Sequence, residues 1–208
     1  MSEPLLQALR VARHFGDVEA LAATDFELSA GETVALVGAN GAGKSTLLAI
    51  LAGALEPTEG TVETHARLGW VPQRPAQYAR LSPRENLELF ARLEGVRDPV
   101  AAARELLARF GLPSGDQAAG ELSVGNRQRL NIALSLLGEP RVLLLDEPTA
   151  SLDPAQRRLV WDVVNALRGE GGAVCFATQN VDEVEHADRI VALQDGHIVG
   201  SSVEAVFG

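Results

Sequence analysis

The sequence is poor in lysine, cysteine and aromatic residues. Lys44 is its only lysine, so arginine supplies the other 17 of the 18 basic residues. Its single cysteine, Cys175, excludes an internal disulfide, and its place in the apolar run 173–177 predicts a buried core residue. Both features fit a reducing cytosol. With 46% hydrophobic but only 4% aromatic residues, the core is predicted to be large and aliphatic.

A basic surface and long apolar segments are absent as well. The formal net charge is −10 and the pI is about 4.9, so the chain has no excess of cations for nucleic acid backbones. No apolar stretch approaches the roughly 20 residues that a membrane helix needs. The first residues do not have the pattern of a signal peptide, so we expect none. We therefore expect a protein that binds no nucleic acid and contacts a membrane only through a partner.

The one lysine ends a glycine-rich segment that matches a phosphate-binding loop. Residues 38–45 read Gly-Ala-Asn-Gly-Ala-Gly-Lys-Ser, which is the pattern G-x-x-x-x-G-K-[ST]. A compact ammonium fits between the β- and γ-phosphates under a tight backbone loop, where a planar guanidinium is too large. The alternative is a glycine-rich turn without a ligand, which would match the full pattern by chance with a probability of about 0.01.

Short apolar runs alternate with helical patterns along the chain. Strands are predicted at 33–37, 68–71, 141–145, 173–178 and 189–193. Helices are predicted at 44–52 and 124–137, and after the capping sequences Ser82-Pro83-Arg84-Glu85, Asp98-Pro99 and Asp153-Pro154. The helix after Asp98 would place Val100, Ala103, Leu107 and Phe110 on one face. The outline is an α/β core interrupted by a helical segment at roughly 79–139.

Two acids, Asp146 and Glu147, directly follow the apolar run 142–145. At the carboxyl end of a parallel strand they would lie near the phosphate loop, where open α/β sheets bind ligands. In P-loop enzymes the strand-end aspartate, here Asp146, holds Mg²⁺ together with the loop hydroxyl, here Ser45. A second carboxylate, here Glu147, is suited to polarise an attacking water. Two solvated acids at a strand end are the alternative, and the phosphate loop argues against it.

The ordered motifs resemble the nucleotide-binding subunit of an ABC (ATP-binding cassette) transporter over nearly the whole chain. Gln73 resembles the glutamine loop, and residues 122–126 (Leu-Ser-Val-Gly-Asn) stand where the LSGGQ signature belongs. The run 151–153 (Ser-Leu-Asp) resembles the D-loop, and Phe15 stands where the family stacks an aromatic ring on adenine. The run 81–93 most resembles exporter-type subunits.

The resemblance implies a P-loop NTPase fold of the α/β class. Its core would have a mostly parallel sheet, an antiparallel β part near the N-terminus and an inserted helical subdomain. The whole chain, 1–208, would be one ABC ATPase domain. Residues 1–78 and 140–208 would form the nucleotide-binding core, and residues 79–139 the inserted helical signature subdomain.

The resemblance also implies ATP and Mg²⁺ as cofactors and a role for each motif residue. Glu147, Gln179 and Gln73 would be catalytic, and Ser45, Gln73 and Asp146 would hold Mg²⁺. The residues expected to contact ATP are Phe15, Gly38, Ala39, Asn40, Gly41, Ala42, Gly43, Lys44, Ser45, Thr46, Ser123, Gly125 and Asp153. Three simpler explanations stay open: core packing for Phe15, a turn for Gln73 and helix capping for Asp153.

The chain departs from the family pattern at two motifs. Gln179 stands where the family usually has a histidine that contacts the γ-phosphate and orients the water and the glutamate. The Gln179 amide donates a hydrogen bond but carries no charge, so we expect slower hydrolysis. In the signature, Val124 adds a β-branched side chain where the family has glycine, and Asn126 has a shorter reach than the usual glutamine.

The implied assembly is a head-to-tail dimer with ATP between one chain's phosphate loop and the other chain's signature. The second nucleotide-binding subunit is either an identical or a different chain, and both alternatives stay open. The helical segment would contact transmembrane permease subunits, which places the protein in the cytoplasm at the inner face of the cell membrane. A poorly hydrolysing regulatory subunit of an asymmetric complex is the main alternative. A soluble ATPase of DNA repair or translation is a third, and the short acidic chain argues against it.

Overall fold

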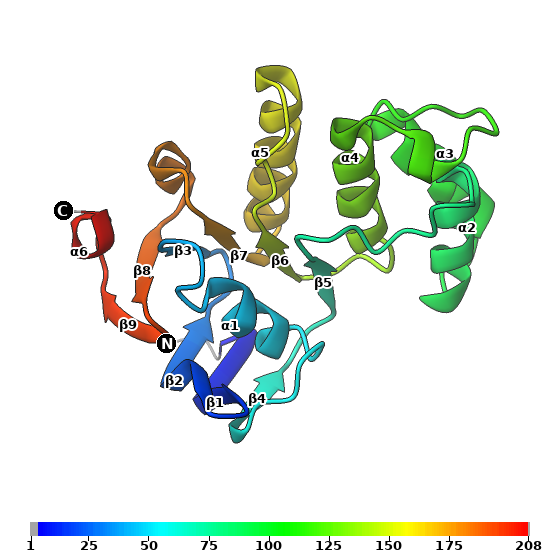
Figure 1. Cartoon of the computed structure of the whole chain (residues 1–208). Coiled ribbons are helices and arrows are strands. Elements are labelled where there is room, and N and C mark those ends of the chain that lie inside the picture. The colour runs from blue at the N-terminus through cyan, green and yellow to red at the C-terminus, as the bar shows by residue number, and fades with distance from the viewer. Residues whose placement is uncertain (1–3, 208) are drawn as a thin grey trace. The chain divides into compact units, whose positions relative to one another are not determined.

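The computed structural model describes residues 4–207 and contains two sheets and several helices (Figure 1). The strands are β1 (Leu6–Phe15), β2 (Val18–Leu28), β3 (Thr33–Val37), β4 (Glu59–Thr64), β5 (Leu68–Val71), β6 (Val142–Asp146), β7 (Ala173–Thr178), β8 (Arg189–Gln194) and β9 (His197–Gly200). The α-helices are α1 (Lys44–Leu51), α2 (Pro83–Leu93), α3 (Pro99–Arg109), α4 (Val124–Ser135), α5 (Pro154–Gly169) and α6 (Glu204–Phe207). Two 3₁₀ turns, η1 (Ala119–Glu121) and η2 (Val181–His186), complete the described elements.

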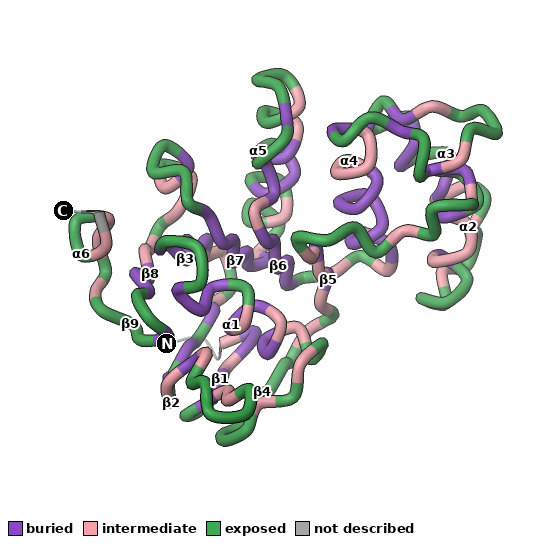
Figure 2. Tube along the Cα trace, viewed as in Figure 1, coloured by how far each residue is buried: buried purple, intermediate pink, exposed green. Residues whose placement is uncertain are grey.

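The larger sheet has the strand order β5-β6-β7-β3-β8-β9. The neighbouring strands β5, β6, β7, β3 and β8 are all parallel, and β9 pairs antiparallel with β8. Every residue of β3, β6 and β7 is buried, which explains why each reads as a continuous apolar run (Figure 2). The predicted bounds of β3, β5 and β7 are confirmed to the residue. Because the strands are parallel, their carboxyl ends meet at one edge.

The smaller sheet has the order β2-β1-β4, and both of its pairs are antiparallel. Helix α1 contacts strands of both sheets, and its side chains Leu47, Leu48, Ile50 and Leu51 are buried in the shared aliphatic core. Cys175 belongs to the same core, as predicted. The mostly parallel sheet, the antiparallel part near the N-terminus and the separate helices confirm the predicted fold class.

Helices α2 and α3 begin where the capping sequences predict. Ser82 Oγ accepts the N–H of Glu85 at 3.3 Å, and a Glu85 carboxylate oxygen accepts the N–H of Ser82 at 2.8 Å, which is a complete capping box. Asp98 caps α3 through the N–H of Ala101 at 3.0 Å. The prediction that Val100 lies on the buried face of α3 is wrong. Val100 is 57% exposed, because it lies in the first turn of the helix and lines an open cavity.

The described residues group into two compact units. Within the described residues, unit 1 comprises 4–73, Arg141–Pro148 and 164–207, and it contains both sheets and α1. Unit 2 comprises Arg74–Pro140 and Thr149–Val163, and it contains α2, α3 and α4. The boundary falls within α5. The division into a nucleotide-binding core and an inserted signature subdomain stays a prediction. None of the helices within residues 4–207 is long and apolar enough to cross a membrane.

Candidate functional site

The loop between β3 and α1 has a geometry that requires glycine at two positions. A Cβ atom at Gly38 would lie 2.3 Å from the backbone oxygen of Leu193, so a larger residue does not fit without a backbone shift. Gly43, which directly precedes α1, has a φ angle of 103° in the left-handed region. The loop thereby gathers backbone N–H groups at the start of α1. Such a concave array of donors suits a phosphate group.

Lys44 lies folded back on this loop. Its Nζ atom donates to the backbone oxygens of Gly38 at 2.7 Å and Ala39 at 3.0 Å, and its side chain is buried. Burial lowers the pKa of Lys44, whereas the nearby carboxylates of Glu147 and Asp146 act in the opposite direction. A buried ammonium that contacts neutral carbonyl oxygens gains a stronger, charge-assisted partner when a phosphate enters the loop.

Asp146, the last residue of β6, is buried next to the loop. Burial raises the pKa of its carboxyl group, while a hydrogen bond with Ser45 and the charge of Lys44 lower it. Among the described side chains, the Asp146 Oδ1 atom is buried without a hydrogen-bond partner. Buried polar atoms in folded proteins nearly always have a partner, so this oxygen indicates a binding site for a ligand or an ion. Because Mg²⁺ binds through oxygen atoms, the Ser45 hydroxyl and the Asp146 carboxylate fit this ion.

Glu147 has a strained backbone. Its φ angle is 49°, in the left-handed region, which costs a residue other than glycine roughly 1–3 kcal/mol. Its N–H donates to the backbone oxygen of Ala177 at 3.0 Å and so ties this residue to β7. Burial raises the pKa of the Glu147 carboxyl, while a hydrogen bond from Gln179 and the charge of Lys44 lower it. The strain is typical of a residue whose side chain is aimed at a ligand.

Gln179 follows β7 and links Glu147 to the loop. Its Nε2 atom donates to Asn40 Oδ1 at 2.8 Å and to Glu147 Oε1 at 3.0 Å. These three residues come from three separate segments of unit 1. The parallel sheet brings them together, because β3, β6 and β7 are neighbours and each segment follows the carboxyl end of one of these strands.

Lys44, Ser45, Glu147, Gln179 and Asn40 line a cavity of about 310 Å³ in unit 1, whereas the buried Asp146 contacts Ser45 but is not one of the lining residues. Its lining residues are Ala20, Asn40, Gly41, Ala42, Gly43, Lys44, Ser45, Thr46, Gln73, Glu147 and Gln179. Sequence reasoning missed Ala20 of β2, since an alanine outside any motif gives no signal. Phe15, at the end of β1, is 49% exposed, and the guanidinium of Arg13 lies 4.6 Å from the centre of its ring. Its stacking on adenine stays a prediction.

The remaining predicted residues lie in unit 2. Ser123 caps α4 by accepting the N–H of Asn126 at 3.2 Å, and Val124 next to it is 52% exposed. A Cβ atom at Gly125 would lie 2.5 Å from the side-chain oxygen of Gln156. Asp153 caps α5 by accepting the Gln156 N–H at 2.9 Å, so its predicted capping role is confirmed. The nucleotide contacts of Ser123, Gly125 and Asp153 stay predictions.

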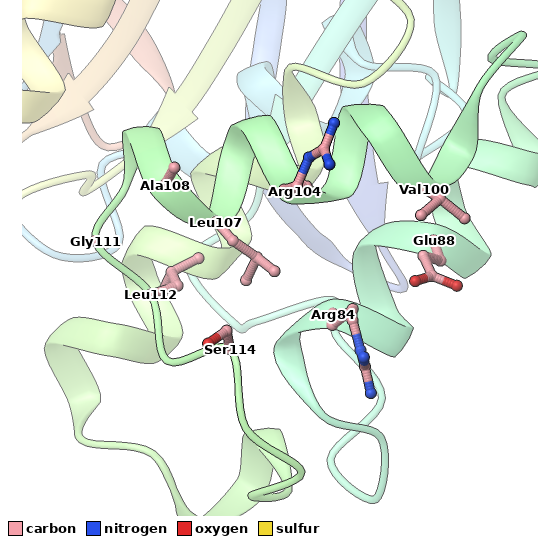
Figure 3. Close-up of a pocket in the computed structure, with 9 residues that line it drawn as sticks. All are labelled: Arg84, Glu88, Val100, Arg104, Leu107, Ala108, Gly111, Leu112 and Ser114. Atoms are coloured by element: carbon pink, nitrogen blue, oxygen red, sulfur yellow. The ribbon is translucent and has the colours of Figure 1, made fainter.

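Unit 2 also contains a second, mainly apolar cavity of about 520 Å³ between α2, α3 and the segment after α3. Figure 3 shows Arg84 and Glu88 of α2 opposite the side chains of α3 and its following segment. The full lining is Arg84, Glu88, Val100, Arg104, Leu107, Ala108, Gly111, Leu112 and Ser114. No motif in the sequence indicated this cavity, because its residues belong to ordinary amphipathic helices.

Comparison with known proteins decides the family. Residues 21–150, more than half of the chain, match the family described as ABC transporter. This chain belongs to the ABC transporter family. Its phosphate loop and strand-end acids lie within the matched part, so the cavity of unit 1 contains motif residues of an ATP-binding cassette. Proteins of this family bind nucleotide.

Similar ABC proteins include several with names that refer to drug resistance or export. The chain is 39% identical to the daunorubicin resistance ATP-binding protein DrrA3 of Streptomyces coeruleorubidus, a match that covers 90% of this chain and 64% of that protein. It is 37% identical to the probable multidrug ABC transporter ATP-binding protein YbhF of Escherichia coli, over 88% of this chain and 34% of that protein. The chain thus spans only part of the length of both.

Solved ABC cassettes have the same fold. A dimeric ATP-binding cassette, MJ0796, in a post-hydrolysis state with ADP and Pi superposes with a TM-score of 0.86 at 26% identity, over 95% of this chain and 97% of that one. An ATP-binding subunit of an ABC transporter superposes with the same TM-score, 0.86, at 26% identity, over 95% of this chain and 89% of that one.

Proposed function

We propose that this chain is the ATP-binding subunit of an ABC transporter and hydrolyses Mg·ATP to drive transport through partner transmembrane subunits. The observation that carries the proposal is the meeting of Lys44, Glu147 and Gln179 in one cavity, around a loop that presents backbone N–H groups. The names of the similar proteins, which refer to daunorubicin resistance and to a multidrug ABC transporter, support a role in transport.

The phosphate loop and Lys44 bind the triphosphate of ATP in this proposal. When the nucleotide enters, Nζ exchanges the backbone oxygens of Gly38 and Ala39 for phosphate oxygens. The N–H groups of the loop and of the first turn of α1 contact the remaining phosphate oxygens. Lys44 stays charged because the phosphates offset the burial that now lowers its pKa.

Ser45, Asp146 and Gln73 are the residues that would hold Mg²⁺. The buried, unpartnered Oδ1 of Asp146 and the adjacent Ser45 hydroxyl support this assignment, and Ser45 and Gln73 both line the cavity of unit 1. Bound Mg²⁺ would neutralise charge on the β- and γ-phosphate oxygens. The chain's own contribution is to keep the two oxygen donors, Ser45 and Asp146, in contact before the ion arrives.

Glu147 takes the proton of the attacking water in this proposal. Only the ionised carboxylate accepts a proton, and its raised pKa makes it a stronger base than an exposed glutamate. Gln179 holds the carboxylate by a hydrogen bond of 3.0 Å. Because the amide is neutral, it stabilises the negative charge that develops on the γ-phosphate less than an imidazolium would. Slower hydrolysis than in histidine-containing cassettes is therefore expected.

Ser123, Gly125 and Asp153 complete the site from a second nucleotide-binding subunit in this proposal. The dimeric state of the similar MJ0796 cassette supports such an arrangement. In a homodimer, both ATP sites would combine Gln179 with the signature that carries Val124. In a heterodimer, Gln179 would act on this chain's own ATP and Val124 on the ATP of its partner. Equilibrium sedimentation of the Glu147→Gln chain with Mg·ATP distinguishes the two, since only a self-pairing chain forms a dimer alone.

A transmembrane permease subunit is the proposed partner of unit 2, which would place the chain at the inner face of the cell membrane. The apolar side chains Val100, Leu107 and Leu112 in the second cavity, flanked by Arg84 and Arg104, suit an amphipathic cytoplasmic segment with an acidic residue. The Arg104→Glu substitution should weaken copurification with the permease while Mg·ATP binding by the chain is retained. Undiminished copurification would contradict this docking surface.

The test of the proposed function is Mg²⁺-dependent ATP hydrolysis by the purified chain or its complex. We expect hydrolysis to fall by about 10²–10⁴-fold on the Glu147→Gln substitution, because the base is removed while the size of the side chain is kept. Binding of Mg·ATP should persist in that variant. Equal hydrolysis by the wild-type and Glu147→Gln chains would contradict the assignment of Glu147.

A second candidate function, motivated by Gln179, is a regulatory subunit that binds ATP but hydrolyses it poorly. In that case the assembled complex should respond to ATP binding without turnover at this chain's site. Single-turnover hydrolysis in the assembled complex separates the two functions. Decay of bound ATP at the rate of substrate transport supports the driving function, and ATP that stays intact through many transport cycles supports the regulatory one.

A further inference from the structure

The side-chain amide of Gln179 contacts both Asn40 of the phosphate loop and Glu147. The Gln179 amide nitrogen carries two hydrogens, and it lies 2.8 Å from Asn40 Oδ1 and 3.0 Å from Glu147 Oε1. Each acceptor therefore receives one N–H. An amide flipped by 180° would instead place its oxygen against two acceptors, one of them the Glu147 carboxylate. The Glu147 carboxylate, which only accepts, sets this orientation, and Asn40 Oδ1 restricts the amide further by accepting its second N–H.

We propose that Asn40 is a positioning residue for hydrolysis, because its side-chain oxygen accepts the second N–H of the Gln179 amide and so holds the amide nitrogen against Glu147. This inference rests on the proposed ATPase function. It is specific to a glutamine at position 179: a neutral imidazole has one N–H, so it cannot donate to both acceptors. The phosphate loop, through Asn40, is thereby connected by side chains to the carboxylate that takes the proton of water.

The backbone on both sides of Gln179 is already fixed, which leaves the side-chain amide as the part that needs positioning. On one side, the buried hydroxyl of Thr178 donates to a carboxylate oxygen of Glu183 at 2.7 Å. On the other side, the N–H of Asn180 donates to the same Thr178 hydroxyl at 3.0 Å. With the turn held in this way, the remaining freedom is rotation of the Gln179 side chain, and the contact with Asn40 restricts it.

A double-mutant cycle tests whether Asn40 acts through Gln179. The Asn40→Ala substitution should lower kcat about fivefold, which matches the loss of one hydrogen bond between neutral groups. The affinity for Mg·ATP should change little, because the loop binds phosphate through backbone N–H groups. In a Gln179→Ala chain, Asn40→Ala should have no further effect on kcat. The exposed Asn165 of α5 offers the matched control, Asn165→Ala, in which kcat should stay unchanged. An equal loss of kcat in both backgrounds would overturn the proposal.

A second readout needs no turnover. In the nucleotide-free chain, Asn40→Ala should move the side-chain ¹⁵N–¹H signals of Gln179 toward the positions of a freely rotating amide, because the contact of 2.8 Å with Asn40 Oδ1 is lost. Signals that stay the same in the Asn40→Ala chain would refute the positioning role. If the wild-type chain showed no hydrolysis, the proposed function would fail, yet these spectra would still decide whether Asn40 orients the amide.

Discussion

Replacement of Gln179 by histidine is the most informative perturbation of this site. The neutral Gln179 amide donates to Glu147 Oε1 at 3.0 Å. An imidazolium differs from this amide in its charge, which would stabilise the negative charge that develops on the γ-phosphate in the transition state. A hydrogen bond from a neutral donor contributes about 0.5–1.5 kcal/mol and a charge-assisted one about 1.5–3 kcal/mol, so the imidazolium should contribute about 1.5 kcal/mol more. Loss of the Asn40 contact, for which a roughly fivefold effect on kcat is expected, offsets about 1 kcal/mol of that gain. The net gain of about 0.5 kcal/mol corresponds to a roughly twofold higher kcat.

The assay is steady-state phosphate release at saturating Mg·ATP, measured from pH 5.5 to 8.5. The carboxylate of Glu147 raises the pKa of the neighbouring imidazole, so the gain should be largest below that pKa and shrink as the pH rises and the imidazole loses its proton. The Asn165→Ala chain again provides the control. Identical rates for the wild-type and Gln179→His chains over the whole range would refute the reasoning, since the neutral amide would then not limit the rate.

Three further predictions follow from individual contacts. Gly38→Ala should lower the free energy of unfolding by about 1–3 kcal/mol in chemical denaturation, because the added Cβ would lie 2.3 Å from the backbone oxygen of Leu193. Gly115→Ala is the control and should leave the free energy of unfolding unchanged, because nothing lies within 4 Å of a Cβ there. Asn86→Ala should cost about 2–4 kcal/mol in the same assay, because its buried amide donates to the backbone oxygens of Tyr78, Leu81 and Ser82; stability like that of the wild-type chain would contradict its anchoring role. Hydrolysis should decline as the pH falls through the pKa of Glu147, which burial raises above the ordinary 4.5, and a midpoint at or below 4.5 in the pH–rate profile would contradict this environment.

The buried parallel strands were predictable from sequence because burial on both faces leaves a continuous apolar run. The antiparallel strands were not located, and the reasons are physical. Strand β1 has register shifts around Val11 and Arg13, so its residues do not alternate regularly between buried and exposed. Strand β4 is polar and almost fully exposed, and β9 is short and exposed, so neither carries an apolar pattern. The antiparallel part near the N-terminus, which comprises β1, β2 and β4, was expected from family resemblance alone.

The same distinction applies to the site. Motif spacing identified Lys44, Asp146 and Glu147, because phosphate and Mg²⁺ chemistry demand those residue types at those places. The contact between Asn40 and Gln179 joins residues 139 positions apart, so no local pattern predicts it. The left-handed backbone of Glu147 was likewise invisible, since nothing in an Asp-Glu-Pro sequence requires it. Such features depend on how neighbouring strands end, which only the folded chain shows.

The most direct test of the central claim is a titration of the nucleotide-free chain with Mg·ATP by isothermal calorimetry, alongside the Lys44→Ala chain. We predict saturable binding at one site per chain. Loss of one charge-assisted contact of about 1.5–3 kcal/mol should weaken that binding roughly 10- to 100-fold in the Lys44→Ala chain. The absence of saturable binding, or equal affinity in both chains, would contradict the claim that this loop and its lysine bind the phosphates of ATP.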